Sequence, residues 1–150
     1  MAGRSGSAGW TGDLMSGSGD LTVGEGAWTG TYSGRSRFHQ VLPGFGQGAG
    51  TNPEELLAAA HAACFTMALS LALSEAGHAP GTIETLARVH LRNVDGLPTI
   101  QEIDLETEAT VPGLDREAFV ERAEHARASC IISRALGGVE QINLSAELAS

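Results

Sequence analysis

One segment, Thr51–Gly77, constrains the fold more than any other part of the sequence. It carries the signals of a long helix, since Asn52 is a good N-cap, Pro53 fits the first helical position and Glu55 stands where a capping-box carboxylate belongs. Gly77 is placed to end the helix. Its middle is apolar on most sides, and such a helix is normally buried at the centre of a protein. We therefore expect the other elements to pack around it.

The stretch Leu56–Leu73 within this helix contains no charged side chain, so its length approaches that of a transmembrane span. Its Ala, Ser, Thr, His and Cys residues make it only weakly hydrophobic. Its flanks carry Glu54, Glu55 and Glu75 and no arginine anchors. We therefore expect a buried helix and no membrane association.

Length and charge narrow the remaining possibilities. The 150 residues suit one domain with a single core, which we place over residues 1–150, with residues 1–8 as a flexible N-terminus. The formal charge of -9 argues against binding to nucleic acid or anionic membranes, whose phosphates attract clustered Lys and Arg. The segment Met1–Gly19 lacks the apolar run of a secretory signal, so we expect a cytoplasmic location.

Short apolar runs between glycine-rich turns predict strands in the rest of the chain. The expected strands are Gly9–Leu14, Leu21–Trp28, Ser33–Phe38, Thr82–Asn93, Thr99–Val111 and Val139–Leu148. A loop is expected over Leu42–Gly50 and a turn at Asp95-Gly96. Two further helices are expected, one capped by Asp115 and ending near Ala128, and a short one, Cys130–Leu136, capped by Ser129. This order predicts an α+β fold with a largely antiparallel sheet packed on helices.

The only two cysteines, Cys64 and Cys130, carry most of the functional information. Because stable disulfides are unusual in the cytoplasm, the two cysteines are structural thiols, part of a metal site, or a transient redox pair. For a zinc site, His61 and His125 would complete a set of two histidines and two cysteines, although the chain has no CxxC knuckle. The spacing of these residues leaves all three interpretations open.

A redox role makes different demands on the two thiols, because the thiolate is the nucleophile. Cys64 lies about twelve residues into its helix, beyond the reach of the helix dipole, and needs a nearby cation such as Arg. Cys130 starts a predicted short helix, where a thiolate is favoured and can attack an oxidised partner or leave when a disulfide is reduced. Candidates for an apolar substrate pocket are Phe38, Phe45, Phe65 and Met67.

Two motifs resemble those of a known family. Thr51-Asn-Pro-Glu-Glu-Leu followed by Ala60-His-Ala-Ala-Cys-Phe-Thr-Met-Ala-Leu-Ser resembles the signature helix of the OsmC/Ohr family of thiol peroxidases, and more its OsmC branch. Ala126-Arg-Ala-Ser-Cys-Ile-Ile-Ser-Arg-Ala-Leu is similar to the segment that holds the family's resolving cysteine. The resemblance runs from about Trp10 to Leu148. It departs from the family at Ile131, where a proline is common.

The resemblance implies roles for four residues. Cys64 matches the peroxidatic cysteine and Cys130 the resolving one, while Arg37, in Ser36-Arg-Phe, matches the active-site arginine and Glu54 its partner carboxylate. The implied fold is an OsmC-like intertwined homodimer, with an antiparallel sheet wrapped around long central helices. The implied activity is reduction of organic or lipid hydroperoxides to alcohols, through a Cys64 sulfenic acid and a Cys64–Cys130 disulfide. A thiol such as a dihydrolipoyl protein is the implied reductant, and no metal or other cofactor is implied.

Helix geometry adds a constraint on that site. Glu54 and Cys64 are ten residues apart on one helix, or roughly 15 Å along its axis, so both cannot touch one peroxide. If Glu54 serves Arg37 beside Cys64, the second subunit supplies Glu54. Arg35 is an alternative cation that the Ser36-Arg-Phe motif disfavours. The main rival function is a non-catalytic small-molecule-binding dimer on the same scaffold, with two structural thiols.

Overall fold

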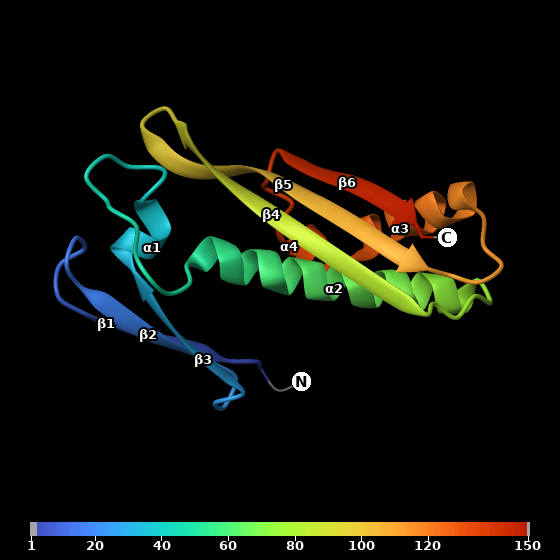
Figure 1. Ribbon diagram of the computed structural model, residues 1–150, viewed down its shortest axis with the longest axis horizontal. Coiled ribbons are helices and arrows are strands. Elements are labelled where there is room, and N and C mark those ends of the chain that lie inside the picture. The colour runs from blue at the N-terminus through green and yellow to red at the C-terminus, as the bar shows by residue number, and fades with distance from the viewer. Residues whose placement is uncertain (1–2, 150) are drawn as a thin grey trace. The chain divides into compact units, whose positions relative to one another are not determined.

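The computed structural model describes residues 3–149, which form six strands and four helices in the order β1-β2-β3-α1-α2-β4-β5-α3-α4-β6 (Figure 1). This order confirms the α+β class. The chain divides into two compact units, unit 1 (residues 1–56) and unit 2 (residues 57–150). The expectation of one domain over residues 1–150 stays a prediction. Residues 1–2, part of the expected flexible N-terminus, lie outside the described residues.

Unit 1 contains a three-stranded antiparallel sheet in the order β1-β2-β3. Its strands are β1 (Gly6–Thr11), β2 (Ser18–Val23) and β3 (Trp28–Ser33). Residues 6–8, which we expected to be flexible, pair with β2. The predicted strand Leu21–Trp28 is wrong in its second half, because Gly24 and Gly26 adopt φ angles of 62° and 95° and turn the chain between β2 and β3.

A short helix, α1 (Gly34–Phe38), stands where the sequence predicts a third strand over Ser33–Phe38. Ser33 is its N-cap, and its hydroxyl accepts a 3.0 Å hydrogen bond from the Ser36 backbone N–H. The Ser36 hydroxyl accepts in return from the Ser33 backbone N–H, also at 3.0 Å. This reciprocal capping satisfies donors at the helix start. The strand prediction was wrong because so short an apolar pattern cannot be told from a capped helical turn.

The predicted long helix is confirmed as α2 (Pro53–Glu75). Asn52 caps it as expected, since its side-chain oxygen accepts a 2.9 Å hydrogen bond from the Glu55 backbone N–H. The Glu55 carboxylate, however, accepts from the Thr51 hydroxyl at 2.8 Å and makes no capping-box bond to the Asn52 backbone. Gly77 adopts a φ of 84°, which lets the backbone N–H groups after the helix bond back to its last turn.

Unit 2 contains a second sheet, in which β5 lies between β4 and β6 (Figure 1). Its strands are β4 (Thr82–Val94), β5 (Leu97–Thr110) and β6 (Gln141–Leu148). The predicted turn at Asp95-Gly96 is confirmed, and both residues have positive φ, as tight hairpins require. The expectation of largely antiparallel pairing is confirmed, since β1 with β2, β2 with β3 and β4 with β5 all pair antiparallel, whereas β6 runs parallel to β5.

The core of unit 2 forms where α2 and α3 (Arg116–Ser129) pack on this sheet. Its largest members, each at most 1% exposed, are Phe65, Leu69, Leu73, Leu105 and Phe119. By length and composition alone, α2 is apolar enough to cross a membrane. Its buried side chains pack with β5 and α3, but only 28% of its apolar stretch is buried, so the helix is covered on one side and is not surrounded as expected from the sequence.

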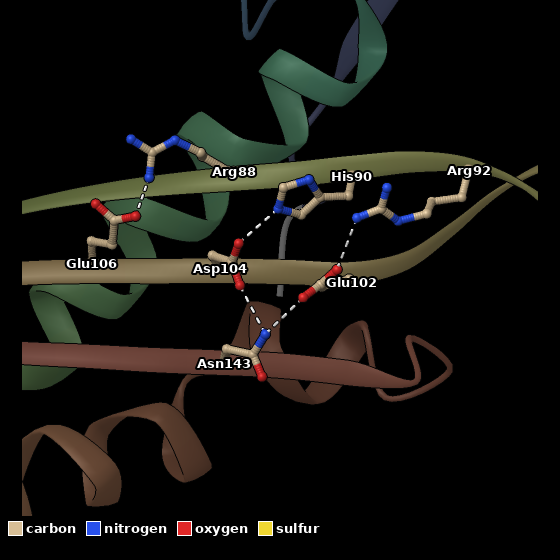
Figure 2. A network of polar contacts seen from close by, with 7 residues as sticks. All are labelled: Arg88, His90, Arg92, Glu102, Asp104, Glu106 and Asn143. Carbon is tan, nitrogen blue, oxygen red and sulfur yellow. Dashed lines mark hydrogen bonds and ion pairs between the residues drawn. The ribbon is translucent and has the colours of Figure 1, made fainter. Parts of the chain in front are cut away.

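The opposite face of the sheet is polar (Figure 2). Arg88 pairs with Glu106, His90 with Asp104 and Arg92 with Glu102, each across β4 and β5. On β6, the Asn143 amide donates to both Glu102 and Asp104. Hydrogen bonds from Asn143 and His90 lower the pKa of Asp104. The alternation along β5 therefore separates an apolar face from a network of paired polar and charged side chains.

Two helices connect β5 to β6. Asp115 caps α3 as predicted, accepting a 2.9 Å bond from the Ala118 backbone N–H. The prediction that Ser129 caps the short helix α4 (Ile131–Ala135) is wrong, because that cap is Cys130. Cys130 closes α3 through its backbone N–H and opens α4 through its sulfur, since the kink between the helices falls at this residue.

We predict unequal effects when leucine is truncated on the two faces of this sheet. Leu105→Ala, at a side chain that is 1% exposed, should lower the free energy of unfolding by about 2–5 kcal/mol, because it leaves a cavity. Leu86→Ala, on the neighbouring strand and 49% exposed, should change it by less than about 0.5 kcal/mol. Urea titration at a fixed protein concentration measures both, and equal losses would contradict this assignment of faces.

Candidate active site

Cys64 and Cys130 lie together in unit 2, where both are free thiols that line one cleft of about 310 Å³. Cys64 is half-buried in the middle of α2, and Cys130 is buried at the junction of α3 and α4. The rest of this lining, which we call the cysteine cleft, is mainly apolar. It includes Met67, Ala68, Leu71, Ala72, Glu75, His125, Ser129 and Ile131. The two cysteines are therefore brought to one place, which is the arrangement that the family resemblance implies.

The sulfur of Cys130 is surrounded by hydrogen-bond donors. Burial raises the pKa of the Cys130 thiol, and this is the largest single influence on it. Bonds from the backbone N–H and hydroxyl of Ser133, the Cys64 thiol and the Ile132 N–H together outweigh burial and lower the pKa below its ordinary value. The Ser133 backbone N–H lies 3.5 Å from the sulfur. A thiol in this setting is suited to attack a neighbouring oxidised sulfur and to leave as a thiolate.

Behind Cys130, the side chains of His61 and Ser133 form a buried contact. His61 Nε2 lies 2.7 Å from the Ser133 hydroxyl, and His61 is 0% exposed. Burial lowers the pKa of His61, so its ring is neutral at neutral pH. The sequence suggested His61 only as a candidate zinc ligand. Ser133 was not singled out, although it lies three residues after Cys130 in the quoted Cys-Ile-Ile-Ser motif.

Arg37 and Glu54 form the second pair of predicted site residues, and both lie in unit 1. Arg37 Nη2 donates to Glu54 Oε1 at 2.8 Å, and Arg37 Nε lies 3.1 Å and 3.2 Å from the two carboxylate oxygens. The carboxylate side chain is 11% exposed and the guanidinium side chain 39%. The pair is therefore held in a bidentate arrangement while part of the arginine faces solvent.

Backbone anchoring explains why these two side chains meet. Gly50 adopts a φ of 97°, and a Cβ there would lie 2.6 Å from the Thr31 carbonyl oxygen. Only glycine allows this approach, which lets the Thr51 backbone N–H bond to the same carbonyl at 2.9 Å. The Ser36 hydroxyl of α1 then donates to the Thr51 carbonyl at 2.7 Å. These bonds fix the start of α2, which carries Glu54, against α1, which carries Arg37.

The residues that the sequence suggested for an apolar pocket or a zinc site lie in different parts of the structure. Met67 lines the cysteine cleft and Phe65 lies in the core of unit 2. Phe38 and Phe45 contact each other in unit 1, with ring centroids 5.5 Å apart. Of the proposed zinc ligands, His125 lines the cleft, whereas His61 bonds to Ser133. Within residues 3–149, no group of three or more His, Cys, Asp or Glu side chains is arranged to hold a metal ion.

Comparison with known proteins gives one consistent family. Residues 46–145 match the model of the OsmC-like protein family. The chain is 42% identical over 134 residues to the peroxiredoxin OsmC of Escherichia coli K12, which covers 89% of each chain. Among solved structures, an OsmC-like protein from Mycoplasma pneumoniae has a TM-score of 0.74 at 18% identity, over 99% of both chains. The organic hydroperoxide resistance protein OhrB of Bacillus subtilis has a TM-score of 0.65 at 27% identity, over 97% and 98%.

We predict that the two thiols form an intramolecular disulfide under mild oxidation by diamide, because both face the cysteine cleft. Intact mass should fall by two hydrogens per chain, and both free thiols should disappear. Neither Cys64→Ser nor Cys130→Ser should give this product, which makes them matched controls. Disulfide-linked chains on a non-reducing gel, in place of the internal bond, would contradict the shared cleft.

Proposed function

The chain belongs to the OsmC-like protein family, and we propose that it is a thiol peroxidase that reduces organic hydroperoxides to alcohols. The observation that carries this proposal is that Cys64 and Cys130 are free thiols on one mainly apolar cleft. The name of the relative at 42% identity and that of the structural relative at 27% identity support a peroxide substrate.

The chemistry proceeds in three balanced steps. The Cys64 thiolate attacks the terminal oxygen of ROOH, the O–O bond breaks, and RO⁻ takes a proton to leave as the alcohol. Cys64 becomes a sulfenic acid. The Cys130 thiolate then displaces the hydroxyl, which takes a proton and leaves as water, and forms the Cys64–Cys130 disulfide. An external dithiol reduces this disulfide by exchange and is itself oxidised to a disulfide. A dihydrolipoyl protein fits this reductant class.

The Arg37–Glu54 pair supplies the positive charge that Cys64 needs. A guanidinium stabilises a thiolate and orients a peroxide oxygen, because its charge is permanent and its donors form a fork. The bidentate bonds from Glu54 fix the plane of this fork. In this role Arg37 contacts the reacting atoms, and Glu54 is a positioning residue.

The lining of the cysteine cleft favours an alkyl or lipid hydroperoxide over hydrogen peroxide. Met67, Leu71 and Ile131 border the two sulfurs, and they are 67%, 60% and 72% exposed. An alkyl chain on these side chains removes apolar surface from water, and hydrogen peroxide has no such group.

We also infer a homodimer with sites shared between subunits. Arg37 pairs with Glu54 of its own chain, so the two move as one group. Cys64 lies roughly 15 Å further along α2 than Glu54. Arg37 and Glu54 of the partner subunit therefore complete the site around Cys64. The exposed apolar stripe of Met67 and Leu71 is suited to an interface between two copies. A cytoplasmic location stays a prediction.

Peroxide treatment tests the cysteine chemistry. With a small excess of cumene hydroperoxide, the reduced protein should lose both thiols and two hydrogens, while Cys130→Ser should accumulate a sulfenic acid or a more oxidised Cys64. Cys64→Ser should consume no peroxide. Intact mass and thiol titration measure these outcomes. Unchanged thiols in the wild type would overturn the peroxidase proposal and favour a non-catalytic binding dimer, and stoichiometric zinc in the purified protein would favour a metal site.

A pair of arginine variants tests the arginine and the sharing of sites. Arg37→Lys should lower kcat/KM about 10²-fold or more, because lysine cannot reproduce the bidentate geometry. Arg35→Lys is the matched control on the same helix, and its kcat/KM should stay within about twofold of the wild type. Co-expressed Cys64→Ser and Arg37→Lys chains, one inactive and the other strongly impaired alone, should recover activity as mixed dimers. Absence of recovery in isolated mixed dimers would show that each site uses one chain only.

A further inference from the structure

The contact between His61 and Ser133 has no part in the proposed peroxidase cycle. It joins residues 72 positions apart in sequence, and it lies directly behind the sulfur of Cys130. His61 is 0% exposed and Ser133 8% exposed. Burying a polar imidazole costs free energy unless it is hydrogen-bonded, so the bond between His61 and Ser133 needs an explanation.

The hydrogen bonds of His61 select its tautomer. The neutral ring has one N–H donor and one acceptor nitrogen. Among the described residues, His61 Nδ1 is buried without a hydrogen-bond partner, and Nε2 contacts only the Ser133 hydroxyl. A proton on Nδ1 would leave a buried donor unsatisfied, and orphaned donors are rarer than orphaned acceptors. The proton therefore belongs on Nε2, which donates to the Ser133 oxygen.

This tautomer fixes the direction of the Ser133 hydroxyl. With its oxygen accepting from His61, the hydroxyl hydrogen is free to donate elsewhere, and the Cys130 sulfur, which already lies 3.5 Å from the Ser133 backbone N–H, is an acceptor on the same side of the residue. If His61 accepted instead, the same hydrogen would point away from Cys130. The geometry thus allows a relay in one direction, from His61 Nε2–H to the Ser133 oxygen and from the Ser133 O–H to the Cys130 sulfur.

We propose that His61 is a positioning residue for Cys130, acting through the Ser133 hydroxyl. This inference rests on the proposed peroxidase cycle. This hydrogen-bond order keeps a donor on the Cys130 sulfur when the Cys130 thiolate attacks the Cys64 sulfenic acid. It does so again when the same thiolate leaves on reduction of the disulfide. A hydrogen bond from His61 to the serine polarises the serine hydroxyl and strengthens its bond to the thiolate.

The test needs no peroxide and uses the Cys64→Ser protein, in which Cys130 is the only thiol. The rate of its alkylation by iodoacetamide is measured against pH and scaled to the plateau at high pH, which cancels differences in access. The other titratable groups that line the cysteine cleft, Glu75 and His125, stay unchanged. His61→Phe and Ser133→Ala should each lower the scaled rate at neutral pH about five- to tenfold, by moving the profile to higher pH.

Comparing the double variant with the single variants tests whether His61 affects the Cys130 alkylation rate through Ser133. Because His61 acts through Ser133, the double variant should match Ser133→Ala alone. His61→Gln, which keeps an N–H near Nε2, should restore most of the rate. Ser129→Ala is the matched serine control, since Ser129 lines the same cleft but donates to the Ala126 carbonyl, and its profile should be unchanged. Additive losses, or an unchanged profile in both single variants, would overturn the proposal.

Two further readouts separate this inference from the peroxidase proposal. In the reduced wild type, ¹⁵N chemical shifts of His61 should report a proton on Nε2. A proton on Nδ1 would overturn the proposed hydrogen-bond order, and this measurement remains available if His61→Phe does not fold. With both cysteines present, His61→Phe should oxidise Cys64 at the wild-type rate but accumulate a sulfenic acid that dimedone traps. If the wild type fails to react with peroxide while the alkylation profiles shift as expected, the peroxidase proposal fails and the role of His61 and Ser133 at Cys130 is still supported.

Discussion

Burial of one side of α2 against β5 is the constraint on which the rest of unit 2 depends. Phe65, Leu69 and Leu73 occupy one stripe of the helix and pack with Leu105 and Ala109 of the sheet. Cys64 is adjacent to Phe65, so the packing of Phe65 fixes how far the thiol projects from the core. It is left half-buried, in contact with core residues and open to the cysteine cleft. Rigid packing thereby sets the position of a reactive group that a loop would hold less precisely.

The start of α2 is fixed by different means. Backbone bonds from Thr51 to β3 and to Ser36 of α1 hold this end, and Asn52 caps it. Glu54 therefore meets Arg37 through polar anchoring, whereas Cys64 meets Cys130 through apolar packing. One helix thus carries one member of each pair of site residues. A change in its pitch or length would alter the spacing between the acidic and the thiol positions, which the proposed sharing of sites between subunits uses.

Local signals and long-range contacts explain which features the sequence could predict. The ends of α2, the Asp115 cap and the Asp95-Gly96 turn depend on neighbouring residues, and all three are confirmed. The short helix α1 and the capping role of Cys130 were missed, because both involve sulfur or serine contacts that also occur in turns. The parallel pairing of β6 and the contact of His61 with Ser133 join distant segments, so no local pattern indicates them. The predicted partners Arg37 and Glu54 came from family motifs, and spacing alone would not have paired them.

The environment of Cys130 illustrates how burial and hydrogen bonding act against each other at one atom. An apolar surrounding keeps a thiol protonated, which would make Cys130 a poor nucleophile and a poor leaving group. Full exposure would leave it mobile and open to side reactions. The helix break between α3 and α4 resolves this conflict, because it aims unsatisfied backbone and side-chain donors of the next turn at a sulfur that stays 1% exposed. Ile131 starts α4 here without the fixed φ of a proline. The position of the Cys130 sulfur therefore depends on these donors, among them the backbone N–H of the buried Ser133.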